Sequence, residues 1–524
     1  MAVSQPITGF AHVSGPAGGW MQITELHSDG LVTSEFSSRK TIGRLSENVP
    51  TVEDGTLSIL PDGRMSALFH LRKGVTWHDG APFTAHDVAF SYKVALAGGI
   101  PPGFTGFMDS VEAQDDSTVV VYYKAPFYLG TKLGPHAFWP VPQHILGAPY
   151  ERLMATGNLV DFLQLPYWNE EYVHLGPFRL TSFDPGQGLR FEANNAYFLG
   201  RPKIDVIELR VFTDQGTLLS NLMAGTVHIS PAHGLLEESA REAKRRWDSS
   251  GDGRVYALEG VLRILLPQLQ PWAFEPTLRD PRVRKAMLHG LDKVELSDVL
   301  SVTPAWSMLP ESDSLYPAVK DGLRQFNYDP ARAHALLSDV GWSLAPDQTL
   351  RNRADGHQFR HAIWGTPGRD QETALYASYW RALGMDVEEQ VIAPALYRDP
   401  AYIRQYPGFN MTGSDPLDVL RNPAGGPHNN WQGNTNGWED PVARRLVDAL
   451  TTTIVEREQL QAWKAIDDYI IAELPMLPIY RGVVYTAANK RVKAFDDMAG
   501  AGGERIPPWY GGYARNAYLW DFHD

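Results

Sequence analysis

The chain has 524 residues, which is too long for one ordinary compact core and predicts two or three domains. Its 61 Asp and Glu residues outnumber its 47 Lys and Arg residues, and the formal net charge of −14 excludes the basic footprint that phosphate-backbone binding needs. Cysteine is absent, which excludes disulfides, thiolate metal sites and a cysteine nucleophile.

Composition alone does not decide whether the protein is cytoplasmic or exported. The first residues, MAVSQPI, show no charged segment followed by an apolar one, so no signal peptide is present in the sequence as written. No apolar run approaches the roughly 20 residues that span a membrane. The lack of cysteine fits an exported chain without proving export. Either the protein is cytoplasmic, or a signal has been removed.

The stretch 72–92 gathers Trp77, His78 and Asp79 and raises the question of a catalytic or metal-binding cluster. Residues 67–72 predict a half-buried strand, because apolar and polar side chains alternate from 69 to 72. Lys73-Gly74 and Asp79-Gly80 are typical of turns. Thr84 and Asp87 match a capping box with Asp in place of Glu, followed by a helix. Each polar residue therefore has a local structural role, and we prefer that interpretation.

Further along the chain, strands and helices are mixed. Residues 119–123, 207–212 and 483–486 are rich in β-branched and aromatic residues and predict strands. Three Asp-Pro pairs predict helix starts, with Asp as N-cap and Pro at the first helical position. These pairs begin at Asp280, Asp329 and Asp440, and the second helix is expected to end before Gly341. The pattern predicts an α/β or α+β chain.

Two other stretches differ in character from these elements. The basic run 241–246 is short and interrupted by an acid, so it predicts a solvated helix face. The loop 421–437 is rich in Gly, Asn and Pro, which indicates a functional surface rather than core.

Residues 69–91, FHLRKGVTWHDGAPFTAHDVAFS, resemble the signature of the family 5 extracellular solute-binding proteins, the dipeptide, oligopeptide and nickel receptors of ABC importers. Six other stretches resemble family segments in the same order: 111–121, 175–180, 193–205, 280–286, 328–337 and 473–480. The resemblance thus covers nearly the whole chain.

The resemblance implies an α/β, two-lobed, periplasmic-binding-protein type II-like fold with an extra subdomain and a cleft between the lobes. Lobe I would comprise three segments, lobe II one, and the subdomain would carry the signature. The implied ranges are 1–45, 175–262 and 480–524 for lobe I, 46–174 for the subdomain and 263–479 for lobe II. The cleft would bind ligand without making or breaking a bond.

The implied function is that of a periplasmic or otherwise extracytoplasmic receptor. It would bind a small polar solute, a peptide or a peptide-like or sugar-conjugate compound, and deliver it to a membrane-embedded ABC permease. We expect no enzymatic activity, no cofactor, no nucleic acid partner and a monomer. A hydrolase of peptides or esters is the alternative from another class, although no Gly-x-Ser-x-Gly elbow or P-loop is present. An oligosaccharide or chelated-metal receptor is the alternative within the class.

The resemblance places two ligand-recognition loops in lobe II. The segment from Trp364 to Asp370 resembles the loop where dipeptide receptors carry an arginine for the peptide carboxylate. Arg369 would pair with such an anion, since a guanidinium binds carboxylates bidentately; the alternative is a surface arginine that starts a helix. In the second loop, Asp415 or Asp418 would hold an α-ammonium group. This loop is shorter than the dipeptide pattern, and Asp415-Pro416 also matches the helix-cap signature.

Three further sites complete the set of expected ligand contacts. Asn430 and Trp431 offer an amide beside an aromatic face, which suits stacking on a sugar or peptide plane; an ordered loop capped by Asn side chains is the alternative. By the same resemblance, Trp20 and the segment from His27 to Asp29, which includes Ser28, lie where family members bring an N-terminal strand end to the cleft. No histidine motif has metal-ligand spacing, so no metal site is expected.

Overall fold

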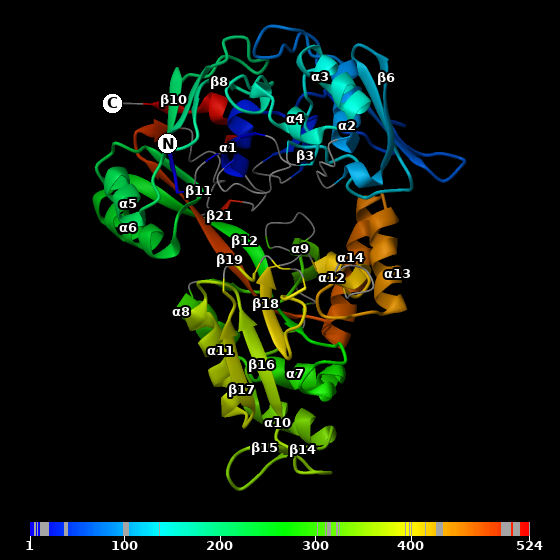
Figure 1. The fold of residues 1–524 in the computed structure, drawn as a ribbon, viewed down its shortest axis with the longest axis vertical. Helices are drawn as coiled ribbons and strands as arrows, with labels where there is room; N and C mark the ends of the chain where they lie inside the picture. The colour runs from blue at the N-terminus through cyan, green and yellow to red at the C-terminus, as the bar shows by residue number, and fades with distance from the viewer. Residues whose placement is uncertain are drawn as a thin grey trace. The chain divides into compact units, whose positions relative to one another are not determined.

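The computed structural model describes most of the chain. The described ranges are 1–4, 7, 9–10, 20–35, 40–97, 104–135, 137–300, 302–309, 311, 316–320, 323, 325–393, 395–397, 399, 401–413, 416–425, 433–493, 505–506 and 514–522, with the backbone alone at 20–22, 232–233, 258–259 and 505–506. The chain divides into two compact units (Figure 1). Unit 1 comprises residues 1–259 and 484–524, and unit 2 comprises 260–483. The predicted ranges of the lobes and the subdomain stay predictions.

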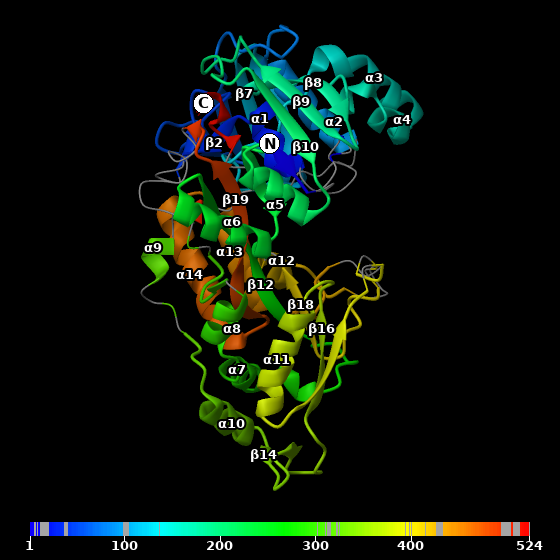
Figure 2. The ribbon, with the colours of Figure 1, turned by 90° about the vertical axis from the view of Figure 1, so that its left-hand side faces the viewer.

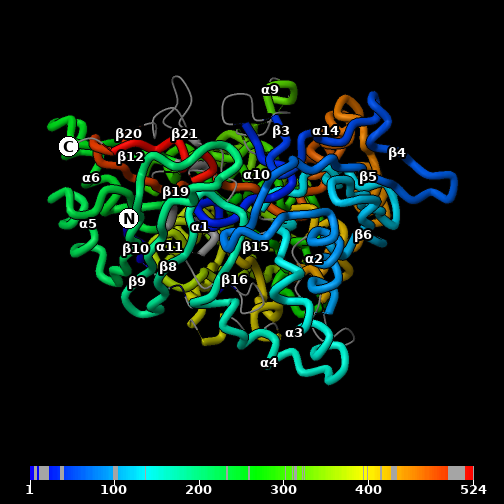
Figure 3. The backbone as a smooth tube through the Cα atoms, turned by 90° about the horizontal axis from the view of Figure 1, so that it is seen from above, coloured from blue at the N-terminus to red at the C-terminus, as the bar shows by residue number. Residues whose placement is uncertain are grey.

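Unit 1 contains two four-stranded sheets. The first has the order β1-β10-β9-β8 (Ala2–Val3, Val206–Val211, Gly188–Ala193, Phe178–Asp184), and the second has the order β4-β5-β7-β6 (Leu57–Ile59, Met65–His70, Thr118–Tyr123, Met108–Asp115). β2 (Val32–Ser34) pairs with β3 (Thr41–Gly43), and β20 (Val492–Lys493) pairs with β22 (Asp521–Phe522). Both chain ends thus belong to this unit (Figure 3).

The helices of unit 1 lie between these strands along the chain. They are α1 (Trp20–His27), α2 (Ala85–Ala97), α3 (Gln143–Thr156), α4 (Leu159–Leu163), α5 (Gln215–Met223) and α6 (Glu237–Ser250), with 3₁₀ turns at Thr105–Phe107, Pro166–Trp168 and Ala517–Leu519. On α6, the predicted solvated basic face is confirmed, because Arg241 and Arg246 pair with Glu237 and Glu242 one turn earlier.

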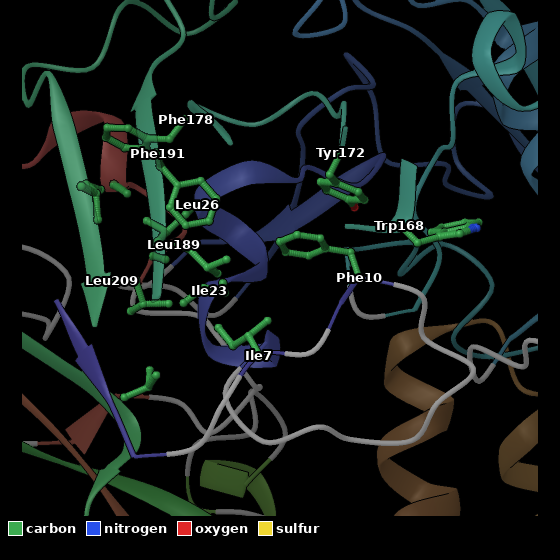
Figure 4. Close-up of a cluster of buried hydrophobic side chains, with 14 of the residues drawn as sticks. Ile7, Phe10, Ile23, Leu26, Trp168, Tyr172, Phe178, Leu189, Phe191 and Leu209 are labelled. Carbon is green, nitrogen blue, oxygen red and sulfur yellow. The ribbon is translucent and has the colours of Figure 1, made fainter. Parts of the chain in front are cut away.

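The main core of unit 1 forms where α1 meets the sheet of β8, β9 and β10 (Figure 2). Ile23 and Leu26 of α1 have no solvent exposure. Figure 4 shows them beside Leu189 and Phe191 of β9, with Phe10 stacked on Tyr172 at 4.3 Å. Burying each such side chain contributes about 1.5–3 kcal/mol. This packing holds α1 in place and thereby positions the residues that follow it.

The stretch 72–92 has the structural roles expected of it. Trp77 is 1% exposed, and its indole N–H faces the carboxylate of Asp87 at 3.4 Å. The same carboxylate accepts the backbone N–H of Thr84 at 2.9 Å, which is one half of the predicted capping box. His78 Nε2 lies 2.9 Å from the carbonyl oxygen of Gly176, and burial lowers the pKa of His78 to about 4. The stretch is therefore a structural element of unit 1.

Two long strands contain the boundaries between the units. β12 (Gly253–Pro267) crosses at 259/260 and β19 (Leu477–Asn489) at 483/484. In unit 1, β11 (Ile229–Leu235) pairs with β19, and β21 (Arg505–Ile506) pairs with β12. In unit 2 the sheet continues in the order β19-β12-β18-β16-β17, with β18 at Phe409–Gly413, β16 at Arg360–Gly365 and β17 at Asp386–Val391. β13 (Thr303–Pro304) pairs with β19, and β14 (Trp342–Leu344) pairs with β15 (Leu350–Asn352).

The helices of unit 2 pack around this sheet and against one another. They are α7 (Pro281–His289), α8 (Lys293–Leu300), α9 (Tyr316–Val319), α10 (Pro330–Asp339), α11 (Asp370–Ala382), α12 (Pro416–Arg421), α13 (Pro441–Thr452) and α14 (Glu456–Glu473), with a 3₁₀ turn at Pro276–Arg279. α11 contacts β16 and β17, α7 contacts α10, and α13 contacts both α12 and α14. A buried cluster including Ile363, Trp380 and Tyr480 forms the core.

All three Asp-Pro helix starts are confirmed. Asp280 accepts the backbone N–H of Arg282, Asp329 that of Arg332, and Asp440 that of Val442. α10 ends at Asp339, and Gly341 follows with φ of +94°, a conformation that glycine adopts without steric cost. Among the helices of the described ranges, none is long and apolar enough to cross a membrane.

Candidate functional site

The first expected recognition loop lies in unit 2 between β16 and α11. β16 is buried from His361 to Gly365 and pairs in parallel with β17 and β18. Gly368 then takes a φ of +77°, which lets the chain turn, and Arg369 is the N-cap of α11. Arg369 therefore starts a helix, as the structural alternative expected. Its side chain is 39% exposed, so a ligand contact stays a prediction.

Arg369 is already engaged inside unit 2. Its Nη1 donates to Glu372 Oε2 at 3.0 Å and to the hydroxyl of Tyr480 at 3.2 Å. Glu372 is 2% exposed, and its other oxygen accepts the hydroxyls of Tyr376 at 2.9 Å and Tyr480 at 2.8 Å. Burial alone would lower the pKa of Arg369, but the neighbouring Tyr480 and Glu372 raise it. A buried carboxylate thus neutralises this guanidinium.

Trp364 lies on the face of the unit 2 sheet opposite to the core cluster that contains Ile363 and Tyr480. Successive side chains of a strand point to opposite faces, and Ile363 packs in the core cluster that contains Tyr480. Trp364 instead stacks on Tyr402, with ring centroids 5.0 Å apart and 26° between the planes. The structure therefore does not bring Trp364 and Arg369 together, although they are only five positions apart in the sequence.

The second expected loop is only partly described. Asp415, Asn430 and Trp431 lie outside the described residues. Asp418 lies in the first turn of α12, where its carboxylate accepts from Arg421 at 3.3 Å and its side chain is 55% exposed. An exposed pair within one helix contributes little stability, so Asp418 stays available as a predicted ligand contact.

The expected N-terminal contacts lie in unit 1. Trp20 is the first residue of α1, and its side chain is not described. Ser28 is 1% exposed, and its Oγ lies 2.8 Å from His27 Nδ1 and 3.4 Å from the hydroxyl of Tyr172. Gly176 packs directly on this backbone, since a Cβ there would lie 2.2 Å from the His27 carbonyl carbon. Ser28 is held in the interior of unit 1.

The acid after Ser28 belongs to a buried ionic network. Arg44 donates from Nε to Asp29 Oδ1 at 2.8 Å, and the hydroxyl of Tyr197 donates to Asp29 Oδ2 at 2.8 Å. Glu25 lies 3.6 Å from Arg515, and burial raises the pKa of Glu25 to about 7. This network ties α1 to the C-terminal segment and gives Asp29 a structural role.

Sequence reasoning missed Arg263, a half-buried residue of β12 in unit 2. It pairs in register with Gly413 of β18. Its guanidinium makes no hydrogen bond or ion pair with any residue in the described part of the chain. The sequence does contain a feature that could have pointed to it: Arg263 is the one charge in the apolar run 261–266, Val-Leu-Arg-Ile-Leu-Leu.

Two buried polar atoms lie on and next to the sheet of the same unit. Asn410 is 5% exposed and Thr366 is 6% exposed. Asn410 Oδ1 and Thr366 Oγ1 have no hydrogen-bond partner among the described residues. Asn410 is the cross-strand neighbour of Trp364. Buried polar groups are normally satisfied, so the Asn410 oxygen marks a polar spot beside the aromatic pair, and Thr366 marks a second one directly after β16.

No group of three or more His, Asp or Glu side chains arranged to hold a metal ion is found in the described ranges. The Ser28–His27 contact is a serine–histidine pair, but both side chains are buried at 1% and 2% exposure. A substrate would have to displace the surrounding core to reach this hydroxyl. The geometry therefore gives the hydrolase alternative no accessible nucleophile there.

Comparisons with known proteins give the chain a family. The model of the family described as "Bacterial extracellular solute-binding proteins, family 5 Middle" matches residues 60–427. The oligopeptide-binding protein AppA of Bacillus subtilis is 25% identical over 343 residues, which is 63% of this chain and 59% of AppA. The chain's match thus spans less than two thirds of that relative.

Solved structures show the same fold. The oligopeptide binding protein of Thermus thermophilus, complexed with a pentapeptide, has a TM-score of 0.70 at 21% identity, covering 100% of this chain and 96% of the other. NikA of Brucella suis, in complex with Fe(III)-EDTA, has a TM-score of 0.74 at 18% identity, covering 100% and 99%. The expected two-lobed periplasmic-binding-protein type II fold is confirmed. Since the family model matches well over half of its residues, the chain belongs to the bacterial extracellular solute-binding proteins of family 5.

Proposed function

We propose that this protein is the solute receptor of an ABC importer, which binds a small polar solute outside the cytoplasmic membrane and delivers it to a permease. The observation that carries the proposal is the family match over residues 60–427. We further propose that peptides are the solute class, because AppA is named an oligopeptide-binding protein and the Thermus protein was solved with a pentapeptide. We propose that it acts as a monomer.

The chemistry of unit 2 supports binding rather than catalysis. The β16–α11 loop offers a partly exposed guanidinium at Arg369, and the sheet offers the half-buried guanidinium of Arg263. The opposite face of the sheet offers an aromatic pair beside the amide oxygen of Asn410, which has no hydrogen-bond partner among the described residues. Cations, aromatic faces and amide acceptors are the groups that hold a peptide without reacting with it. Members of this family are binding proteins and not enzymes.

A thermal-shift screen tests the proposal. The probes are degenerate pools of dipeptides, tripeptides, pentapeptides and nonapeptides, with Ni(II)–L-histidine, Fe(III)–EDTA and maltopentaose as representatives of the chelate and sugar classes. A ligand at 100 times its Kd stabilises the folded state by about 2.7 kcal/mol. For units of this size, each kcal/mol raises the melting temperature by about 2–4 °C. We therefore expect a rise of several degrees with at least one peptide pool.

Two controls separate the alternatives. Mass spectrometry of the pools after incubation should return every peptide unchanged, and cleavage would support the hydrolase. A shift with maltopentaose or a chelate alone would replace the peptide class by that class. The absence of any shift at millimolar concentration would contradict the receptor proposal as a whole.

A further inference from the structure

Unit 2 places two arginines around one tyrosine. Tyr480 lies on β19, Arg263 lies on the neighbouring strand β12, and Arg369 donates to the Tyr480 hydroxyl. Burial raises the pKa of Tyr480 and Glu372 raises it further, while Arg369 and Arg263 both oppose the rise. Arg263 also opposes the rise at Tyr376, the other tyrosine bound to Glu372. The two guanidinium groups therefore belong to one electrostatic cluster.

The charges of this cluster do not balance. It contains two arginines and one carboxylate, that of Glu372. Glu372 pairs with Arg369 and accepts two tyrosine hydroxyls, so its oxygens are occupied. Arg263 has no carboxylate partner in the described ranges of the chain. A partly buried cation without a counter-charge is costly, because desolvation is not offset by pairing.

The backbone next to Arg263 leaves room for its guanidinium. A Cβ on Gly413, its cross-strand partner, would lie 3.3 Å from Arg263 Nη1 and 2.9 Å from Val261 Cγ1. A side chain at 413 would therefore crowd the guanidinium. With glycine there, the guanidinium of Arg263 lies over the strand, and none of its N–H groups donates to a described residue.

We propose that Arg263, the guanidinium of this cluster that has no carboxylate partner among the described residues, binds a carboxylate of the solute. This inference rests on the proposed receptor function and narrows the solute to compounds with an acidic group. A guanidinium offers a planar pair of donors that matches a carboxylate, and charge-assisted pairs of this kind are the strong hydrogen bonds. The carboxylate of a peptide can come from its C-terminus or from an acidic side chain.

The test uses three tripeptide pools and the full-length protein. The first pool has free C-terminal carboxylates and no acidic side chains, the second is the same pool as C-terminal amides, and the third is amidated with one glutamate fixed. The half-saturating concentration of each pool is read from the melting temperature. Charge-assisted pairing predicts that one of the acidic pools binds roughly 10- to 100-fold more tightly than the neutral amides. The tighter pool identifies the source of the carboxylate.

Variants of the two arginines assign the effect. Arg263→Gln should weaken the acidic pool roughly 10- to 100-fold and remove the preference over amides, while Arg263→Lys should keep part of it. Arg369→Gln removes the counter-charge of buried Glu372, so it should lower the melting temperature of the free protein. Arg360→Gln is the matched control, because Arg360 is an exposed arginine of β16 in the same unit.

Each outcome bears on the inference. An Arg263→Gln protein that keeps the wild-type preference for acids would overturn it, as would equal binding of acidic and amidated pools by the wild type. If Arg263→Gln does not fold, two other measurements test the inference. These are the ratio of the wild-type affinities for acidic and amidated pools, and the same ratio for Arg263→Lys. If no tripeptide pool shifts the melt, the carboxylate inference falls. A shift with another probe of the screen would then leave the receptor function standing, and no shift with any probe would overturn both.

Discussion

Lys293 in unit 2 predicts a pH dependence of stability that can be measured directly. The side chain is 2% exposed, and its Nζ donates to the carbonyl oxygens of Ala305 at 2.9 Å and Pro478 at 3.3 Å. The ammonium also lies 3.7 Å from the centroid of the Trp306 ring. No carboxylate pairs with it in the described part of the chain. Burial lowers the pKa of Lys293 from 10.5 to about 7.

The sign and size of the effect follow from proton linkage. Between pH 7 and 10.5 the unfolded chain keeps the Lys293 proton while the folded protein has lost it, so stability rises with pH in this window. The lowering from 10.5 to about 7 corresponds to about 5 kcal/mol at 1.36 kcal/mol per pKa unit. The cation–π contact with Trp306 favours the charged form, which makes this value an upper limit.

The assay compares urea unfolding of the wild type with Lys293→Met at pH 7, 8, 9 and 10. The free energy of unfolding of the wild type should rise relative to the variant by several kcal/mol across this series, since other titrating groups cancel in the difference. Lys320→Met, which removes an exposed lysine of the same unit, controls for the loss of a surface charge and should show a flat difference. A flat difference for Lys293→Met, within about 1 kcal/mol, would refute the reasoning.

Three further predictions test the structure, and two of them have a control variant. Burial raises the pKa of Glu25 from 4.5 to about 7. The free energy of unfolding should therefore fall by at most about 3 kcal/mol as pH rises from about 4.5 to 7, because the unfolded chain loses this proton first. Glu25→Gln should remove that fall when urea unfolding is compared at pH 5 and 8. Gly176→Ala should lower the melting temperature by overpacking that costs about 1–3 kcal/mol or more, because its Cβ would collide with the backbone of residue 27. Gly147→Ala, inside α3, where a Cβ would meet the flexible Gln143 side chain at an ordinary contact distance of 3.9 Å, should leave the melting temperature unchanged or raise it. Asp280→Ala should cost about 1 kcal/mol in urea unfolding through loss of a helix cap, and Asp280→Asn should cost clearly less.

The parts of the fold that depend on neighbours in sequence could be predicted. The helix caps at Asp280, Asp329 and Asp440 each involve a backbone N–H two or three residues away. The turn at Gly80 needs only its own positive φ, observed at +91°. The structural interpretation of Trp77 also held, because its partner Asp87 lies in the first turn of the following helix. Such interactions depend on spacing, which a sequence displays.

The arrangement of the candidate site could not be read in this way. Arg369 and Tyr480 are 111 residues apart, and the sequence around Arg369 does not predict that a tyrosine of β19 hydrogen-bonds to it. Glu372 could be seen as a neighbour on the same helix, but its burial and its two tyrosine donors depend on how β19 packs against α11. Trp364 and Arg369 are close in sequence, yet the alternation of side chains along β16 turns Trp364 away from the core cluster that contains Tyr480, the residue to which Arg369 donates.

Arg263 shows why the sequence identified the family but not the chemical class of the solute. The family signature lies in local turns and caps of unit 1, and these stabilise the fold whatever solute is bound. The unbalanced charge arises only because β12 pairs with β18 and lies beside β19, which brings Gly413 and Tyr480 to Arg263 from 150 and more residues away. An arginine within the apolar run 261–266 was visible in the sequence, but its lack of a counter-charge among the described residues depends on strand register. Because that lack is what makes Arg263 the proposed partner of a solute carboxylate, the proposal depends on long-range strand pairing and could not be made from the sequence.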